Sequence, residues 1–174
     1  MEKPEEKGMG SVNKHEYLKH LNNILNPRLY LEIGVHYGKS LKIAKCERIG
    51  IDPEPLTDCR GVCKCTSDDF FKNKASKYLK KRKPDLIFID GMHLFEYALR
   101  DFINCEKYSY PSTLIVMDDI FPVHPKQAQR NRETKKWTGD VWKMVYILKE
   151  YRPDLHLSFV DAYPTGLMLI RNLK

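Results

Sequence analysis

Short apolar runs rich in β-branched residues alternate with longer helical patterns through most of this 174-residue chain. The clearest run is DLIFID at 85–90, whose nearly continuous apolar character is typical of a strand covered on both faces. Strands that alternate with helices build parallel sheets with crossover helices. The chain is therefore predicted to form an α/β fold with a mostly parallel sheet of about seven strands.

The predicted elements follow one another without an internal repeat or a flexible linker. Strands are expected at 29–33, 48–51, 61–65, 85–90 and 113–117, and the last two, at 155–160 and 167–170, are expected to form a C-terminal β-hairpin. Helices are expected at 11–25, 39–46, 94–108 and 141–148, with a further helix beginning at an N-cap Ser67. Residues 120–138 fit neither pattern, and a polar connection of that length is typical of a functional lid.

Length and composition are those of a globular protein. With 42% hydrophobic and 30% charged residues the chain is neither disordered nor collagen-like. We expect a flexible N-terminal tail at 1–10 and a single domain at 11–174. No apolar run approaches the ~18 residues that span a bilayer, and the charged first residues lack the apolar centre of a secretory signal. These features predict a cytoplasmic protein without a membrane partner.

The five cysteines do not suggest a disulfide framework, because an odd number in a chain without a secretory signal is unsuited to one. The spacing C-x3-C-x-C at 59–65 also lacks the paired C-x2-C of structural zinc sites. Cys63 and Cys65 are explained equally well as alternate residues of a buried strand. The cysteines are Cys46, Cys59, Cys63, Cys65 and Cys105.

Acidic residues stand at the ends of four predicted strands. Glu32 ends the first, Asp52 the second, Asp90 the fourth, and Asp118 with Asp119 the fifth. In parallel sheets ligands bind beyond the carboxyl ends of the strands, where a buried carboxylate is costly unless something binds it. Four such positions on one edge therefore indicate a binding site.

Two glycines, Gly34 and Gly38, lie in the turn after the first strand and allow the backbone to approach a ligand closely. The turn matches neither G-x-G-x-x-G nor a phosphate-binding loop. With Glu32 beside it, the turn suits a cationic or zwitterionic ligand better than a pyrophosphate. Asp52 stands where a carboxylate can accept both ribose hydroxyls. The alternative for each glycine is an ordinary tight turn.

These motifs resemble those of a known family. LEIGVHYGKS followed by GIDPEP resembles the opening motifs of class I S-adenosylmethionine (SAM)-dependent methyltransferases. FIDGMHLFEYALRDF followed by LIVMDDI resembles the small-molecule and sugar O-methyltransferases that carry an aspartate-glycine-x-histidine motif after strand four, with catechol-type metal-dependent relatives. The resemblance covers residues 28–171 and implies a Rossmann-like class I methyltransferase fold with SAM as cofactor.

The resemblance also implies roles for individual residues. Glu32, Gly34, Gly38 and Ser40 would hold the methionine part of the cofactor and Asp52 its ribose. Ser67 and Asp68 would contact the adenine, and Asp90 would also border the cofactor. Asp90, Asp118 and Asp119 would bind Mg²⁺ or another divalent cation, since such ions prefer oxygen ligands. The family often carries asparagine at the last of these positions, which leaves the identity of the metal open.

Two catalytic residues are expected, His93 and Asp118. His93 stands where catechol-type enzymes carry a lysine base, and histidine titrates near neutral pH. It is interpreted as a base or a metal ligand, with a structural role in the next helix or loop as the alternative. For the substrate we expect His124, Trp137 and Asp140, within or beside the predicted lid. Asp140 is explained equally well as a charge near a helix N-terminus, and Trp142 as a core anchor.

The sequence thus predicts a SAM-dependent methyltransferase that methylates an oxygen of a small molecule or sugar with the help of a divalent metal. An alternative is an RNA methyltransferase that uses the basic segment 126–136, in keeping with a net charge of +7. Nucleic acid is the less favoured partner, because the strand-four end lacks the Asn-Pro-Pro-aromatic motif. A second alternative is a Rossmann-like interaction module without catalysis. The acceptor, the methylated atom and the formation of a homo-oligomer stay open.

Overall fold

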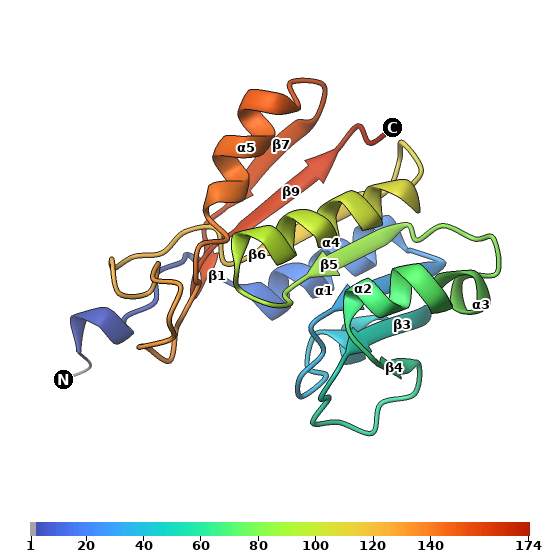
Figure 1. Cartoon of the computed structure of the whole chain (residues 1–174), viewed down its shortest axis with the longest axis horizontal. Coiled ribbons are helices and arrows are strands. Elements are labelled where there is room, and N and C mark those ends of the chain that lie inside the picture. Colours follow the sequence, from blue (N-terminus) through green and yellow to red (C-terminus); the bar gives the residue numbers. More distant parts are fainter. Residues whose placement is uncertain (1–2) are drawn as a thin grey trace.

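The computed structural model describes residues 3–174 and contains a seven-stranded sheet with the strand order β4-β3-β2-β5-β6-β9-β7 (Figure 1). All neighbouring strands are parallel except at β9, which runs antiparallel to both β6 and β7. The predicted mostly parallel sheet and its C-terminal hairpin are confirmed. The strands are β2 (Leu29–Ile33), β3 (Glu47–Asp52), β4 (Val62–Lys64), β5 (Leu86–Ile89), β6 (Leu114–Asp118), β7 (His156–Val160) and β9 (Leu167–Arg171).

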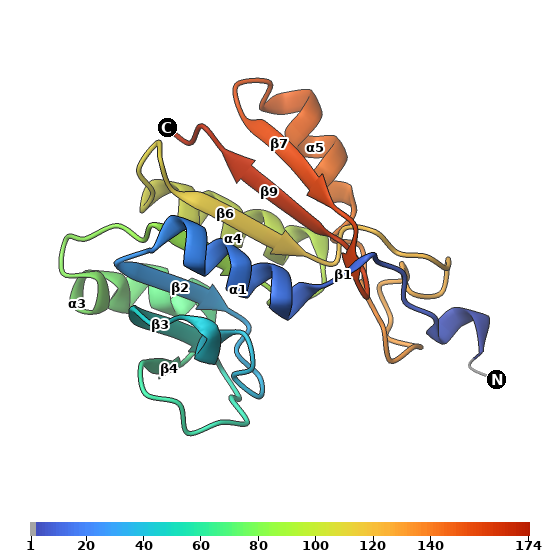
Figure 2. The same cartoon turned by 180° about the vertical axis from the view of Figure 1, so that it is seen from behind.

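Helices cover both faces of this sheet. Helix α1 (Lys14–Leu25) lies on one face, seen from the front in Figure 2, and the other helices lie on the opposite face. Side chains of a strand alternate between faces, so Tyr30 of β2 packs in the cluster of α1 while Leu31 packs in the cluster of α4. The other helices are α2 (Ser67–Asp69), α3 (Ala75–Leu79), α4 (Phe95–Lys107) and α5 (Lys143–Tyr151).

The N-terminal segment is joined to the end of the chain. Strand β1 (Val12–Asn13) pairs in parallel with β8 (Ala162–Tyr163), beside the carboxyl edge of the sheet. Asn13 then caps α1, because its side-chain oxygen accepts hydrogen bonds from the first backbone amides of the helix. This pairing fixes the start of α1 near the carboxyl ends of β5 and β6.

The predicted helix at 39–46 is wrong: only one 3₁₀ turn, Leu41–Ile43, forms there. Ala44 is already extended, and the Arg48 guanidinium donates hydrogen bonds to the carbonyls of Leu41 and Ala44. A side chain from the following strand therefore satisfies carbonyls that a longer helix would have paired with its own amides.

The helix after β4 differs from expectation in two ways. Its N-cap is Thr66, whose hydroxyl accepts a hydrogen bond from the Asp69 amide, and not Ser67. Residues Phe70–Lys74 form a π turn between α2 and α3. The wider turn accompanies two consecutive buried rings, Phe70 and Phe71, which pack edge to face with centroids 5.3 Å apart.

Residues 119–142 contain no helix or strand, as predicted for 120–138. The buried Gln127 side chain fixes this loop to the N-terminal segment, because its amide donates to the carbonyl oxygens of Glu5 and Lys7. Residues 3–10, which fall within the predicted flexible tail, therefore contact the predicted lid. The division into tail and domain stays a prediction. Within residues 3–174, no helix combines the length and the hydrophobicity needed to cross a bilayer.

The cysteines of residues 3–174 are free thiols. Cys63 and Cys65 are both buried at β4, with their sulfur atoms 3.4 Å apart, as expected for alternate residues of a buried strand. The group of potential metal ligands in this part of the chain contains no cysteine.

Candidate functional site

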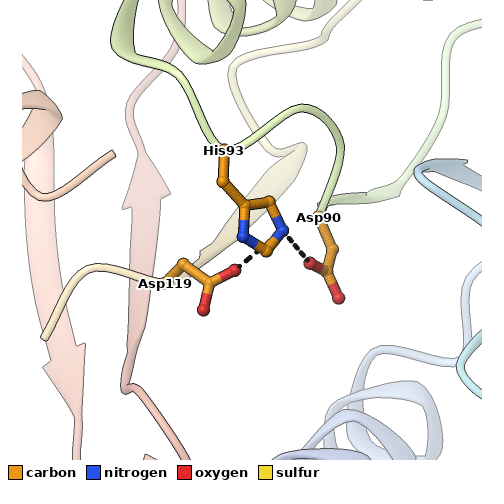
Figure 3. Close-up of side chains that lie close together, drawn as sticks. All are labelled: Asp90, His93 and Asp119. Carbon is orange, nitrogen blue, oxygen red and sulfur yellow. Dashed lines mark ion pairs between the residues drawn. The ribbon is translucent and has the colours of Figure 1, made fainter. Parts of the chain in front are cut away.

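Asp90, His93 and Asp119 come together where β5 and β6 end (Figure 3). The Nε2 atom of His93 lies 3.1 Å from Oδ2 of Asp119 and 3.4 Å from Oδ1 of Asp90. One potential ligand atom from each residue lies within 4.8 Å of the others. A small cavity adjoins the cluster and is lined by Ile89, Asp90, Gly91, Met92, His93, Ala98, Met117, Asp118, Asp119 and Val141.

The loop 119–142 fixes the orientation of His93. Its Nδ1 atom lies 2.6 Å from the carbonyl oxygen of Trp137, and its ring stacks on the Trp137 indole with centroids 5.3 Å apart. A carbonyl can only accept, so Nδ1 carries a proton and Nε2 faces the two carboxylates. Gly139 is required at this contact, because a Cβ there would lie 1.6 Å from the His93 carbonyl oxygen.

Asp119 is held by a left-handed backbone and by a neighbouring hydroxyl. Its φ is +63°, a conformation that aspartate adopts more readily than most residues. The Thr165 hydroxyl donates a hydrogen bond of 2.6 Å to Oδ1 of Asp119, which leaves Oδ2 directed at His93. The loop between β8 and β9 thus contributes to the site, although it carries none of the predicted site residues.

Sequence reasoning missed Lys14, the first residue of α1. Its ammonium donates to Oδ2 of Asp90 at 3.0 Å and to Oδ2 of Asp118. Asp118 therefore faces Lys14, whereas the other two predicted metal ligands face His93. No spacing or motif distinguishes Lys14 among the 30 lysine and arginine residues, so the sequence held no signal for it.

These buried charges shift one another's pKa. Burial alone would lower the pKa of His93, but the Asp119 and Asp90 carboxylates raise it to about 10. Burial would raise the pKa of Asp90, yet Lys14 and His93 hold it well below its usual range. For Asp118, burial and the neighbouring carboxylates outweigh Lys14 and raise the pKa to about 8. Shifts of this kind are concentrated at functional sites.

The predicted cofactor side lies next to the cluster, at the ends of β2 and β3. Gly34 has a φ of +85°, and a Cβ there would lie 1.7 Å from the Asp90 carbonyl oxygen. Only glycine allows this contact between the turn and the end of β5. Gly38 also has a positive φ, of +69°. The glycine turn is thereby placed directly against Asp90.

Asp52 organises the same turn. Its Oδ2 accepts hydrogen bonds from the backbone amides of Val35 and His36 at 2.9 and 2.8 Å, and its Oδ1 accepts one from Glu54. The residue predicted to bind ribose thus also fixes the backbone beside it.

Glu32 is fully buried, and its two carboxylate oxygens accept hydrogen bonds from the hydroxyls of Tyr30 and Ser40, both at 2.7 Å. Burial raises the pKa of Glu32 to about 7, although these two hydroxyls oppose the shift. Glu32 and Ser40 were both expected to hold the methionine part of the cofactor, and in the structure they are hydrogen-bonded to each other. Tyr30 was missed.

The residues predicted near the adenine lie at the start of α2. Asp68 forms an ion pair with Arg100 of α4 at 3.1 Å, with both side chains about half exposed. Asp101 is a buried carboxyl whose pKa is raised to about 7 chiefly by burial, a shift that the nearby Ser67 side chain opposes. Asp101 was missed, although its spacing from the buried Ala98 and Cys105 places it on the inner face of α4.

The predicted substrate residues have different surroundings. Trp137 lies against His93 at the cluster. Asp140 is buried, and its carboxylate accepts from the Phe95 amide at the start of α4 and pairs with Arg130 and Lys143. Asp140 therefore lies at a helix N-terminus, as in the alternative interpretation, but at that of α4 and not of the helix that follows it in the chain. The nitrogen of His124 accepts from the Lys126 amide within the loop.

Basic residues of segment 126–136 are engaged inside the molecule. Arg130 pairs with Glu96 and Asp140, and Lys126 with Glu5. An open groove rich in basic residues lies instead before β3, at the opposite edge of the sheet from the cluster. It is lined by Lys42, Ala44, Lys45, Cys46, Glu47, Arg48, Arg60 and Gly61.

The sequence was also compared with known protein families. A family described as a methyltransferase domain matches residues 31–120, from β2 to the end of the acidic pair after β6. The chain belongs to this methyltransferase family. The predicted methyltransferase family is confirmed. No curated protein matches the chain in sequence.

Solved structures agree with this fold. An O-methyltransferase from Bacillus cereus in complex with S-adenosylhomocysteine (SAH) is 17% identical with a TM-score of 0.65, covering 90% of this chain and 79% of that one. Cofactor-bound Rv0187 from MTB is 14% identical, with a TM-score of 0.69 and coverages of 92% and 80%. The SAH-bound methyltransferase PaMTH1 from Podospora anserina is 17% identical, with a TM-score of 0.58 and coverages of 92% and 78%. At these identities the likeness establishes the fold.

The cluster also fits a divalent cation. The His93 Nδ1 proton is held by the Trp137 carbonyl, an arrangement common for histidines that bind metals, so Nε2 is the nitrogen that would bind a cation once it has given up its own proton. Together with Asp90 and Asp119 this gives two oxygen ligands and one nitrogen. A nitrogen ligand suits Mn²⁺ or another transition metal better than Mg²⁺.

Proposed function

We propose that this methyltransferase binds SAM and transfers its methyl group to a hydroxyl oxygen of a small molecule or sugar. The observation that carries the proposal is the cluster of Asp90, His93 and Asp119 directly beside the glycine turn. The turn supports a cofactor site and the cluster supports activation of an acceptor oxygen. The turn and the cluster touch at Gly34 and Asp90, so a cofactor and an acceptor bound there would lie side by side, as methyl transfer requires.

In this proposal the cofactor lies across the ends of β2 and β3. Glu32 and Ser40 border its methionine part, Asp52 its ribose, and Ser67 and Asp68 its adenine. The sulfonium carries a positive charge, and the acidic strand ends favour that charge. Asp52 and Gly34 hold the turn in shape before the cofactor arrives.

Asp90, His93 and Asp119 would hold a divalent cation, and the chemistry that such an ion would supply is a lowered pKa of an acceptor hydroxyl. Asp118 accepts the hydroxyl proton. The oxygen then forms a bond to the methyl carbon while the carbon–sulfur bond breaks, and SAH leaves as the neutral thioether. Trp137 offers a ring for stacking of the acceptor beside His93.

Calorimetric titration with SAH tests the cofactor site, once with Mn²⁺ and once with a chelator. Micromolar binding in both runs is expected, because the proposed cofactor contacts do not include the cation. Phenolic and sugar acceptors are then incubated with SAM and Mn²⁺, and methylated product and SAH are measured by mass spectrometry. Absence of SAH binding in both runs would contradict the proposal and favour the interaction module.

RNA methylation is the weaker alternative, because Arg130 and Lys126 are ion-paired within the molecule. It requires RNA binding that weakens steeply with salt, which an electrophoretic mobility series measures directly. A cytoplasmic location and homo-oligomer formation stay predictions.

A further inference from the structure

Two cationic side chains, Lys14 and His93, share the carboxylates at the ends of β5 and β6. The Lys14 ammonium contacts Asp118 and Oδ2 of Asp90, while His93 contacts Asp119 and Oδ1 of Asp90. Asp90 thus offers one oxygen to each cation. Asp118 is the most buried carboxylate of the three, with 1% of its side chain exposed, and its ion-pair partner in the structure is Lys14.

The position of Lys14 is fixed by the fold. It follows β1, which pairs with β8, and the buried Leu18 and Leu21 anchor the same helix against the sheet. Only 18% of the Lys14 side chain is exposed. A lysine held this firmly against two carboxylates acts as a permanent charge of the site.

We propose that Lys14 is a positioning residue that keeps Asp118 out of the cation's ligand set and leaves this carboxylate to the acceptor hydroxyl. The inference rests on the proposed function and assigns different tasks to carboxylates that stand side by side in the sequence. Without the ammonium, Asp118 would lose its cationic partner, and it would join Asp90 and Asp119 as a third carboxylate that recruits a cation.

The geometry supports this division. Asp118 and Asp119 are consecutive, and the Asp119 amide donates to Oδ1 of Asp118 at 2.9 Å. The remaining oxygen of Asp118, Oδ2, is the one that Lys14 contacts. Each oxygen of Asp118 therefore accepts one hydrogen bond from the chain, which holds the carboxylate in place while a second lone pair can still accept from the acceptor hydroxyl. By contrast, Oδ2 of Asp119 and Oδ1 of Asp90 face His93.

Lys14→Met tests the inference, because methionine keeps the unbranched shape and most of the length of the side chain and removes its charge. Mn²⁺ is titrated calorimetrically into the wild type and the variant. We expect affinity for Mn²⁺ to rise about tenfold or more, since a unit charge a few ångströms away is removed and Asp118 becomes a ligand. Lys19→Met, an exposed lysine on the same helix, should leave the affinity unchanged.

Two further variants separate this role from a structural one. In Lys14→Met with Asp118→Asn the gain in Mn²⁺ affinity should disappear, because the added ligand is gone. Lys14→Arg keeps the charge and should keep the wild-type affinity. SAH affinity and the unfolding midpoint of each variant report whether the fold is intact.

The outcomes are distinct. Equal Mn²⁺ affinity in the wild type and Lys14→Met would overturn the inference while leaving the proposed function in place. Weaker binding in Lys14→Met, with SAH binding intact, would overturn it as well. If no variant binds Mn²⁺, both the inference and the metal part of the proposed function fail, whereas loss of SAH binding in the wild type contradicts the proposed function alone.

Discussion

Two acidic regions lie on the same edge of the sheet and are neutralised in different ways. At the ends of β5 and β6, carboxylates meet the cations Lys14 and His93. At the ends of β2 and β3, Glu32 and Asp52 meet neutral donors, namely hydroxyls and backbone amides. The first region holds carboxylates against cationic side chains, and the second uses the Asp52 carboxylate to shape a backbone turn.

An acidic residue at a strand end can therefore have one of two roles, which its hydrogen-bond and ion-pair partners distinguish. Where cations surround it, substitution is expected to affect chemistry. Where amides and hydroxyls surround it, substitution is expected to affect binding and stability. Each variant below tests one side of this comparison.

The largest effect is expected for His93→Ala in the β5 and β6 region. Loss of the imidazole removes the partner of both Asp90 and Asp119, and turnover should fall by about 10²–10⁴-fold. SAH affinity should change little, because the cofactor side is untouched. Methyl transfer to an acceptor found in the screen measures the first quantity and calorimetry the second. His156→Ala, an exposed histidine of β7, is the matched control.

The next effect concerns stability and Glu32. Its pKa is raised to about 7 in the folded protein by burial, so between the unfolded value of 4.5 and about 7 the folded state binds more protons than the unfolded state. Stability linked to Glu32 is therefore highest below pH 4.5 and falls as pH rises to about 7. Glu32→Gln should remove this loss and gain roughly 3 kcal/mol relative to wild type between pH 4.5 and 8.

Urea unfolding of both proteins at pH 5 and pH 8 measures the Glu32 effect. Asp101 also has a pKa raised to about 7 by burial, but it is present in both proteins, so the difference between them isolates Glu32. A difference between variant and wild type that does not change with pH would show that Glu32 is ionised in the fold. Glu32 would then belong with the charged region.

A smaller effect is expected for Asp52→Asn in the β2 and β3 region. The charge-assisted bonds to the Val35 and His36 amides weaken, so the glycine turn loses its order. SAH affinity should fall by about tenfold, in line with the loss of a hydrogen bond to a charged group. Turnover at saturating SAM should be preserved. A loss of turnover with unchanged SAH affinity would show that the β2 and β3 region affects the chemistry as the β5 and β6 region does. Asp58→Asn, which changes an exposed carboxylate, is the control.

The sheet was predictable because each strand carries its own apolar run, and strand ends follow from where these runs stop. The convergence of Asp90 and Asp119 followed from this rule. The role of Lys14 did not, because its partners lie 76 and 104 residues away in the chain. The missing helix at 39–46 has a local cause, since the Arg48 guanidinium takes the carbonyls that periodicity alone assigns to a helix.

Asp140 gives the smallest expected effect and lies outside both regions. Its carboxylate accepts from the Phe95 amide, so Asp140→Ala removes a cap from α4 and should lower the free energy of unfolding by about 1 kcal/mol. Arg130 and Lys143 are about half exposed and regain water, which keeps the loss small. Urea unfolding measures this, with Asp58→Ala as an exposed control. If Asp140→Ala instead lowers turnover with unchanged stability, Asp140 contacts the acceptor, and the charged region extends into the loop.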